Sequence, residues 1–509
     1  MSRQFSDFSS ILQGHALSQG GKTAIRYGAE SISYASLADN VARFAGLLLA
    51  LGIGPGDSCV IALPDCPEFI HAFLGALHCG IVAAPVSPQL PAKHYAAIFR
   101  DTGASALVTQ EGSTPAAVWN GPDAMRICID ASGFADQFAR SAPAPACIPA
   151  KDGPHFMLFT SGSTGEPKGV PHTQRDMMAC ARHYADEVLG MEPDDVVLSA
   201  SKMNFAFGLG NSLIFPLYHG ATVVLHPGGC GPAELFALPQ LVADKAPTLF
   251  FAVPSVYAML LRILDGDASP LTSLRLCVSA GESLPAALYH AWRETTGLEI
   301  VDGIGSTEAL HIYISNRPGV STPGVTGRVV PGYELRLVGD DGLPPPDDQP
   351  GRLHLRGESL TRGYINRPAH NAASLLAEGW FDTGDIFVHV DDAYRYQGRA
   401  DDLFKVGGNW VAPLLVEEVL REHPAVQECV VTGHDVEGLL LPVAHVVAAS
   451  GAADASEVAR ELRGFVQSRL PAHMCPGRYL FREDLPRTGT GKINRGELKQ
   501  NQASGLPCA

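Results

Sequence analysis

The sequence lacks three patterns that assign proteins to common classes. Eleven cysteines are scattered from Cys59 to Cys508 without a C-x-x-C pair, which excludes the usual thiol-rich metal and redox motifs. No apolar run reaches the roughly 18 residues needed to cross a bilayer. No basic block offsets the net charge of −16. We therefore expect neither a membrane-bound protein nor broad nucleic-acid binding.

A secretory signal is also missing from the start of the chain, and scattered cysteines suit free thiols in a reducing compartment. These features predict a soluble, cytoplasmic protein. The 509 residues, 46% of them hydrophobic and 18% charged, exceed what a single hydrophobic core usually serves. We expect at least two domains.

The first part of the chain alternates short apolar runs with helical patterns. Runs at 59–63 and 81–86 flank a predicted helix at 67–80, and such alternation is typical of parallel sheets covered by helices. Residues 111–154 are rich in Ala, Pro, Gly and Ser and are interpreted as an irregular connection with one strand at 126–129.

Later segments extend this pattern and then change it. Residues 160–310 are interpreted as a second doubly wound unit, whose ligands should bind beyond the carboxyl ends of its strands. Short strands from Gly332 indicate a small β subdomain. The predicted fold class is α/β: a large N-terminal domain (1–398) of two doubly wound α/β subdomains plus a small β subdomain, a hinge (399–402) and a small mobile α+β C-terminal domain (403–509).

The most informative stretch is the hydroxyl- and glycine-rich segment 160–169. Its glycines permit a tight turn close to an anion, its hydroxyls add donors, and Lys168 adds a cation. It is not a Walker A loop, because Pro167 stands where that motif has its second glycine. The alternative is a flexible surface loop. We interpret the segment as a phosphate-binding loop between an apolar run at 156–159 and a helix that begins near Thr173.

Two acidic turns could complete a nucleotide site. Glu308 closes the Gly-Ser-Thr-Glu turn 305–308, and Mg²⁺ takes one or two carboxylates together with phosphate oxygens. A helix cap with an acidic first turn is the alternative. Asp385 closes a second turn, 381–385, whose carboxylates could accept hydrogen bonds from ribose hydroxyls, although an ordinary surface turn would have the same composition.

These motifs resemble those of the adenylate-forming superfamily, which contains the acyl-CoA synthetases, the luciferases and the adenylation domains of peptide synthetases. The resemblance covers nearly the whole chain. It implies that the phosphate loop contacts ATP through Thr160, Ser161, Gly162, Ser163, Thr164, Gly165 and Lys168. The other implied nucleotide contacts are Gly281, Glu282, Asp302, Gly303, Ile304 and Gly305 near the adenine, and Asp385 and Arg399 at the ribose. Many relatives have an aromatic residue where Ile304 stands, so adenine packing should be aliphatic on that side.

The resemblance also implies the catalytic groups. Thr307 would contact the α-phosphate, Glu308 would bind Mg²⁺, and Lys492 in the loop 486–495 would bridge the carboxylate and the α-phosphate. Without the resemblance, Lys492 would be taken as a solvated lysine. The implied reaction is attack of a carboxylate on the α-phosphate of ATP, with release of pyrophosphate and formation of an acyl-adenylate.

A second half-reaction is implied as well. In this superfamily the C-terminal domain turns about a hinge, which maps onto Asp401 here. The turn withdraws the lysine and brings a tunnel segment to the pantetheine arm of coenzyme A. The residues of that segment are Lys405, Gly407 and Gly408.

Two segments, 202–211 and 302–319, resemble the benzoate-CoA ligase branch. Their aromatic and small residues could form a flat slot for a ring, although core packing and a buried structural histidine are the alternatives. No aspartate stands near 205–207 to hold an α-ammonium group. Relatives often have tyrosine where Phe207 stands. The implied acyl pocket consists of Phe205, Ala206, Phe207, Gly208, Gly281 and His311.

The resemblance therefore predicts an AMP-forming aryl-CoA ligase for benzoate or a substituted benzoate such as anthranilate, with ATP, Mg²⁺ and coenzyme A as its other small molecules. A stand-alone adenylating enzyme that loads an acyl carrier protein and a non-catalytic ATP-binding relative stay open as alternatives. No nucleic acid or membrane partner is expected, and homodimerisation is left open.

Overall fold

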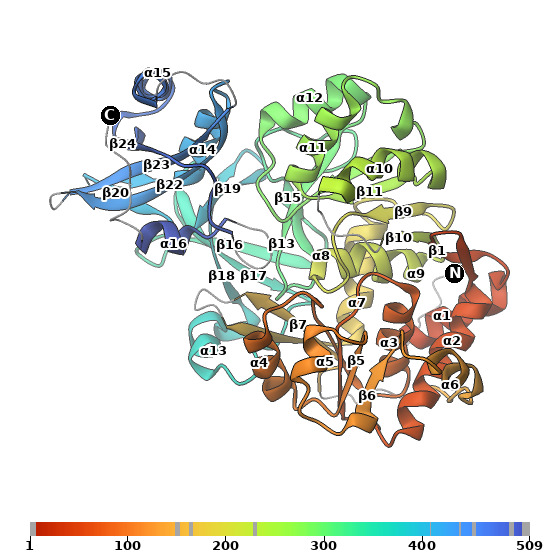
Figure 1. Cartoon of the computed structure of the whole chain (residues 1–509). Coiled ribbons are helices and arrows are strands. Elements are labelled where there is room, and N and C mark those ends of the chain that lie inside the picture. The colour runs from red at the N-terminus through yellow and green to blue at the C-terminus, as the bar shows by residue number, and fades with distance from the viewer. Residues whose placement is uncertain are drawn as a thin grey trace. The chain divides into compact units, whose positions relative to one another are not determined.

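The structure is a computed structural model that describes residues 7–147, 153–161, 166–226, 232–407, 409–436, 439–449, 455–487 and 493–500. The chain forms two compact units (Figure 1). Unit 1 comprises Met1–Glu334 and Arg356–Trp380, and unit 2 comprises Leu335–Leu355 and Phe381–Ala509. The hinge predicted at 399–402 and the domain limits on either side of it stay predictions.

Within the described residues, unit 1 has a nine-stranded sheet with the order β15-β14-β13-β12-β11-β9-β10-β1-β2. Six successive strands of this sheet run parallel to one another, in the order β1, β10, β9, β11, β12 and β13. The bounds are β1 (Thr23–Tyr27), β2 (Glu30–Ser33), β9 (Val196–Ser199), β10 (Thr222–Leu225), β11 (Leu249–Ala252), β12 (Leu276–Ser279), β13 (Ile300–Gly305), β14 (Ile312–Ser315) and β15 (Arg328–Val329). The hairpin near the N-terminus thus pairs with strands almost 200 residues later.

A six-stranded sheet with the order β6-β5-β3-β4-β7-β8 is the second sheet described in unit 1. Its strands are β3 (Ser58–Ile61), β4 (Val82–Pro85), β5 (Ala106–Thr109), β6 (Arg126–Cys128), β7 (Phe156–Ser161) and β8 (Pro167–His172). Strand β8 runs antiparallel to β7 and lies at the edge. The interpretation of 160–310 as one unit is therefore wrong at its start, because β7 and β8 belong to this six-stranded sheet and not to the nine-stranded one.

Two helices join the sheets. Helix α2 (Tyr34–Ala50) contacts β1 and β2, helix α3 (Pro67–His78) contacts β3 and β4, and the two helices pack against each other. Every residue of α3 except Glu68 is buried. A helix that is apolar on all sides must be covered on all sides, which α2 and the six-stranded sheet help to do. Helix α1 (Phe8–Gln19) packs against α2 and α3.

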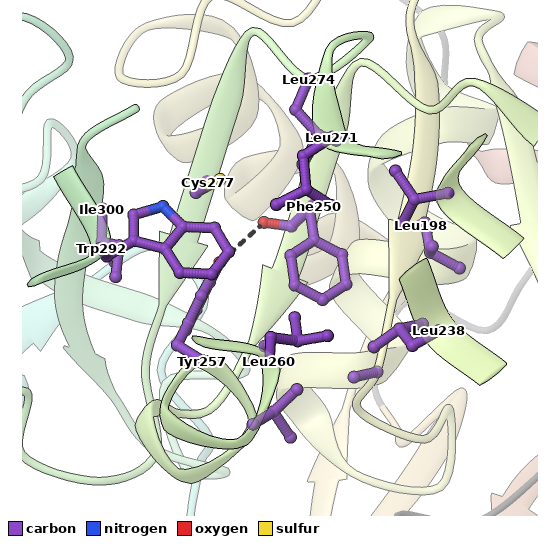
Figure 2. Packing of buried hydrophobic residues seen from close by; sticks show 14 of the residues in the cluster. Leu198, Leu238, Phe250, Tyr257, Leu260, Leu271, Leu274, Cys277, Trp292 and Ile300 are labelled. Atoms are coloured by element: carbon purple, nitrogen blue, oxygen red, sulfur yellow. Dashed lines mark hydrogen bonds between the residues drawn. The ribbon is translucent and has the colours of Figure 1, made fainter. Parts of the chain in front are cut away.

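One hydrophobic core of the nine-stranded sheet lies against helices α10 (Pro232–Lys245), α11 (Pro254–Leu264) and α12 (Ala286–Thr296). Figure 2 shows Phe250, Tyr257 and Trp292 packed together there. The Tyr257 hydroxyl donates to the Phe250 carbonyl at 3.1 Å, and its ring meets the Trp292 ring edge-on at 4.9 Å. Burial of such aromatic side chains stabilises the fold by about 2–3 kcal/mol each.

The connection 111–154 contains more regular structure than predicted. The strand at 126–128 is present, but helices α5 (Thr114–Val118) and α6 (Phe134–Arg140) replace part of the expected irregular chain. Ser113 caps α5 by accepting from Ala116 N, and Pro115 lies in its first turn, so local capping signals explain this helix. The other helices of unit 1 are α4 (Ala92–Thr102), α7 (Gln174–Cys180), α8 (Ala206–Leu209), α9 (Phe215–His219) and α13 (Pro368–Ser374).

Unit 2 is centred on two sheets and a hairpin within its described residues. The first sheet has the order β16 (Tyr333–Val338), β17 (Pro350–Gly357), β18 (Phe381–Val390) and β19 (Ala393–Arg399), and the hairpin is β20 (Phe404–Val406) with β21 (Asn409–Val411). The second sheet pairs β22 (Val426–Val436), β23 (Leu439–Ala448) and β24 (Arg478–Phe481). Helices α14 (Pro413–Arg421) and α15 (Ala455–Gln467) cover that sheet, and α16 (Arg495–Gln500) contacts β22. No helix in the described ranges is long and apolar enough to span a bilayer.

Candidate nucleotide and acyl site

Strands β7 and β8 hold both ends of the predicted phosphate loop. Thr160 pairs with Lys168 and Ser161 with Pro167 across the hairpin, so the strands fix the spacing of the chain on either side. The Lys168 ammonium lies 4.8 Å from the centre of the Tyr364 ring. The predicted contacts at the tip of the loop, Gly162, Ser163, Thr164 and Gly165, lie outside the described residues.

A strained turn follows β13 and carries Thr307 and Glu308. Leu310 N donates to the Thr307 carbonyl at 3.0 Å. Leu310 has a φ of 67° and its side chain is fully buried. A left-handed conformation at a leucine costs on the order of 1 kcal/mol or more. Surrounding contacts must therefore hold the turn in place.

Three successive carbonyl oxygens of this turn, those of Thr307, Glu308 and Ala309, accept hydrogen bonds from other segments. The donors in that order are His172 Nε2 at 2.8 Å, Thr361 N at 2.8 Å, and the hydroxyls of Ser359 at 2.7 Å and Tyr333 at 3.2 Å. Donors from three parts of the sequence converge on three successive residues. The arrangement holds the backbone from which the two predicted catalytic side chains project.

The Glu308 carboxylate is oriented by a second contact. The Tyr364 hydroxyl donates to Glu308 Oε1 at 2.7 Å, and Lys168 lies over the same tyrosine ring. Among the described residues no group of three His, Cys, Asp or Glu side chains could hold a metal on its own. A single carboxylate still fits Mg²⁺, because Mg²⁺ commonly takes one or two carboxylates and completes its shell with phosphate oxygens and water.

The predicted adenine segments lie on two neighbouring strands or directly after them. Ser279 at the end of β12 pairs with Asp302 in β13, so the 281–282 segment follows β12, whereas 302–305 continues β13 and pairs with β14. Burial raises the pKa of the Asp302 carboxyl well above its usual value. Gly281 has a φ of 88°, which few other residues tolerate.

Backbone packing explains the glycines beside Ile304. A Cβ on Gly303 would lie 2.9 Å from Ile312 Cγ2, and one on Gly305 would lie 2.4 Å from the His311 carbonyl oxygen. Both are closer than real side chains approach. The exposed Glu282 accepts from the Ser255 amide at 3.2 Å.

The predicted acyl residues form an aromatic cluster around His311. The centre of its ring lies 4.5 Å from that of Phe215, 5.2 Å from Tyr184 and 5.5 Å from Phe207. Nε2 of His311 lies 3.2 Å from Asn211 Oδ1. Burial lowers the pKa of His311 to about 3, so its imidazole is neutral near pH 7.

Helix α8 supplies the other side of this cluster. Phe205 precedes the helix and Ala206 and Phe207 open it. A Cβ on Gly208 would lie 2.0 Å from the Lys202 carbonyl oxygen, so the glycine allows the chain to fold back on itself. Phe205 is 37% exposed, unlike the buried Ala206. It is therefore not a core residue.

Within unit 2, the predicted ribose residues meet across two strands. Asp385 pairs with Arg399 across β18 and β19, and Arg399 Nη1 donates to Asp385 Oδ1 at 3.1 Å and to the Thr383 carbonyl at 2.8 Å. Arg399 thus holds the buried Asp385 carboxylate in place. A carboxylate held in this way can accept hydrogen bonds from two neighbouring hydroxyls.

The ammonium group of a lysine contacts the predicted hinge in unit 2. Lys499 of α16 donates to the Asp401 carbonyl at 2.9 Å and to Asp402 Oδ1 at 2.8 Å. In the following hairpin, Lys405 lies 3.2 Å from Asp340 Oδ2 and 4.3 Å from the Trp410 ring centre. Gly407 has a φ of 57°, whereas Gly408 and Lys492 lie outside the described residues.

Family models match most of this chain. The AMP-binding enzyme model matches residues 12–365, and the model of the AMP-binding enzyme C-terminal domain matches residues 415–492. The chain belongs to the AMP-binding enzyme family. The membership predicted from the motifs is confirmed, and both halves of the family's architecture are present.

Relatives of this AMP-binding enzyme share its length. Benzoate–CoA ligase from Thauera aromatica is 36% identical over 501 residues, which cover 94% of this chain and 93% of the relative. Anthranilate–CoA ligase from Pseudomonas aeruginosa is 36% identical over 477 residues, which cover 89% and 88%.

Solved structures agree with the fold. A benzoate CoA ligase from Burkholderia xenovorans superimposes with a TM-score of 0.88 at 34% identity, covering 97% of this chain and all of that one. An anthranilate CoA ligase in complex with anthranoyl-AMP gives a TM-score of 0.90 at 32% identity, covering 97% of both. The predicted α/β architecture with a large N-terminal and a small C-terminal part is confirmed.

Several residues that contact the candidate site were not predicted from the sequence. His172, Tyr364 and Asn211 each contact a predicted site residue. A signal existed for one of them, because the helix start expected near Thr173 places His172 directly before the capping residue. Nothing in the sequence pattern indicates the contacts of Tyr364 or Asn211.

Proposed function

We propose that this chain is an AMP-forming aryl-CoA ligase that activates benzoate or a substituted benzoate. One observation carries the proposal. The turn that bears Thr307 and Glu308, whose carbonyls accept hydrogen bonds from other segments, is followed at once by His311, which lies among aromatic rings. Polar groups suited to phosphates and an apolar region suited to an aryl group are therefore three residues apart. The benzoate–CoA and anthranilate–CoA ligases among its relatives support this substrate class.

The first half-reaction joins the acid to AMP. A carboxylate oxygen of the acid attacks the α-phosphorus of ATP, the bond to pyrophosphate breaks, and an acyl-adenylate forms. Thr307 donates its hydroxyl to the α-phosphate, Lys168 and the loop beside it hold the phosphates, and Lys492 bridges the acid and the α-phosphate. Glu308 would hold Mg²⁺, which supplies charge neutralisation when bound.

The second half-reaction releases AMP. The thiol of coenzyme A attacks the acyl carbonyl, and AMP leaves as a thioester forms. We assign Asp401 as the hinge about which residues 403–509 turn, and Lys405, Gly407 and Gly408 as the segment that contacts the pantetheine arm. These roles, and those of Asp385 and Arg399 at the ribose, are inferred from the family motifs.

The aromatic cluster restricts the acid. His311 is neutral and Phe207 provides a flat apolar surface, so the cluster suits an uncharged ring better than an ammonium or a second carboxylate. A small polar substituent beside His311, such as the amine of anthranilate, could form one hydrogen bond. We infer that the enzyme works in the cytoplasm, where its described cysteines, all free, would stay reduced.

The test is a substrate panel with purified enzyme. Benzoate, 2-aminobenzoate, the hydroxybenzoates, hexanoate and octanoate are compared for ATP–pyrophosphate exchange, and for AMP release with and without coenzyme A. We expect a benzoate to give the highest kcat/KM and coenzyme A to be needed for turnover. If a fatty acid exceeded every ring by about tenfold, roughly 1.4 kcal/mol, the aryl assignment would be wrong. Exchange without thioester formation would favour the loading of a carrier protein.

A further inference from the structure

His172 lies between a carboxylate and a carbonyl deep in unit 1. Its Nδ1 is 3.1 Å from Asp176 Oδ2, and its Nε2 is 2.8 Å from the Thr307 carbonyl oxygen. The side chain is fully buried, and its ring stacks on Phe156 at 5.5 Å. The imidazole therefore has one orientation, set by a carboxylate, a carbonyl and an aromatic ring.

The Asp176 side chain is itself held by Thr173. Asp176 Oδ2 accepts from Thr173 N at 2.9 Å, and Asp176 Oδ1 accepts from the Thr173 hydroxyl at 2.8 Å. These contacts form the capping box that starts α7. The group that faces Nδ1 of His172 is therefore fixed by the start of this helix.

The Nε2 atom of His172 is the donor in its contact with Thr307, because a carbonyl oxygen only accepts. The accepting turn contains the strained Leu310, so loss of this donor would remove one of the contacts that hold the turn.

We propose that His172 is a positioning residue: its ring is fixed by Asp176 and Phe156, and its Nε2–H donates to the Thr307 carbonyl and thereby holds the backbone from which the Thr307 and Glu308 side chains project. The part of the proposal that concerns catalysis rests on the proposed function. His172 acts on the reacting groups through the backbone of Thr307. Its effect should appear in the adenylation rate and not in the affinity for the aryl acid.

Two variants separate the donor from the bulk of the ring. His172→Leu removes the Nε2 donor and leaves the Thr307 carbonyl without this partner, whereas His172→Gln can still present an amide N–H near the position of Nε2. A matched control is His78→Leu, because His78 is also buried and its Nε2 lies 3.0 Å from the carbonyl of Ala144, in a part of unit 1 to which we assign no role in the reaction.

The readout is kcat and KM for ATP–pyrophosphate exchange, together with transfer of a supplied acyl-adenylate to coenzyme A. We expect His172→Leu to lower the exchange kcat by roughly 30-fold, the size of the penalty for leaving a buried acceptor unpaired. The KM for the acid should stay within about twofold, and His172→Gln should recover to within about threefold of wild type. His78→Leu should lower the melting temperature and leave kcat unchanged.

The donor role is tested independently of activity. In ¹⁵N-histidine-labelled wild-type protein, Nε2 of His172, assigned from the signals lost in His172→Gln, should carry a directly bonded proton. An Nε2 without a proton in the wild type would overturn the proposal. Equal exchange rates in His172→Leu and wild type, or no recovery in His172→Gln, would overturn it too. If the wild type activates a different class of acid, only the proposed substrate is wrong, and the same series is measured with that acid.

Discussion

Two buried histidines mark the two ends of one short turn, and their surroundings are opposite. His172 contacts the Thr307 carbonyl and a carboxylate, and it stacks on a single ring. His311 lies among three aromatic rings, with Asn211 as a polar contact. The same residue type thus lies beside the polar turn, which we propose acts on the phosphates, and within the aromatic cluster, which we propose binds the ring of the acid. The comparison suggests that the two regions can be disrupted separately.

The largest effect should come from the polar region. Glu308→Gln removes the negative charge that would hold Mg²⁺ and keeps the size of the side chain. We expect ATP–pyrophosphate exchange to fall by about 1000-fold, roughly 4 kcal/mol of transition-state stabilisation. Transfer of a supplied acyl-adenylate to coenzyme A should change by less than about threefold, since that step needs no pyrophosphate release. An equal loss in both steps would show that Glu308 supports the fold and not adenylation.

The contribution of the aromatic cluster around His311 to the stability of the fold should fall in acid. The pKa of His311 is about 3 in the folded protein and about 6.5 in an unfolded chain. The unfolded state therefore binds more protons between these values, and stability falls as the pH drops below about 6.5. The variant His311→Leu should lack this pH-dependent contribution to stability.

The measurement is urea unfolding of wild type and His311→Leu at pH 7 and pH 4.5. Between these two pH values the wild type should lose about 2–3 kcal/mol more stability than the variant. Identical pH dependence in both proteins would mean that His311 is not held neutral by burial.

A glycine tests how tightly the rings enclose His311. A Cβ on Gly210 would lie 2.3 Å from His311 Cδ2, so Gly210→Ala must displace the imidazole. We expect kcat/KM for the aryl acid to fall by roughly 30-fold, about 2 kcal/mol. Gly464→Ala is the matched control, because Gly464 is exposed within α15 with no atom close to an added Cβ. That control should keep full activity.

The smallest effect should come from the Tyr364 hydroxyl. Tyr364→Phe removes its hydrogen bond to Glu308 Oε1 and keeps the ring beside Lys168. The exchange kcat should fall by about fivefold, the value of one ordinary hydrogen bond near 1 kcal/mol. If the KM for the aryl acid rose instead, the polar and aromatic regions would not be independent.

The sequence predicts the parts of the site that local chemistry determines. Thr160 and Lys168 belong to a glycine- and hydroxyl-rich segment, and the helix expected near Thr173 begins at Gln174 with Thr173 as its cap. The strand β8 was not predicted, because Pro167 and Pro171 cannot donate to a ladder. The structure accommodates both prolines since β8 is an edge strand.

Long-range contacts explain what the sequence does not show. His172 and Thr307 are 135 residues apart, so no local pattern connects them. The left-handed Leu310 is equally unpredictable, because leucine disfavours that conformation and tertiary donors impose it. Tyr364 and Glu308 are likewise far apart in the sequence and are brought together by the fold.

The central claim is that one turn separates a phosphate-binding region from a ring-binding region. The most direct test is a crystal structure with a non-hydrolysable benzoyl-adenylate analogue. The account predicts that the group replacing the α-phosphate lies within hydrogen-bond distance of the Thr307 hydroxyl and that the benzoyl ring lies against Phe207 and His311. An analogue bound away from Thr307, or with its ring directed away from His311, would contradict it.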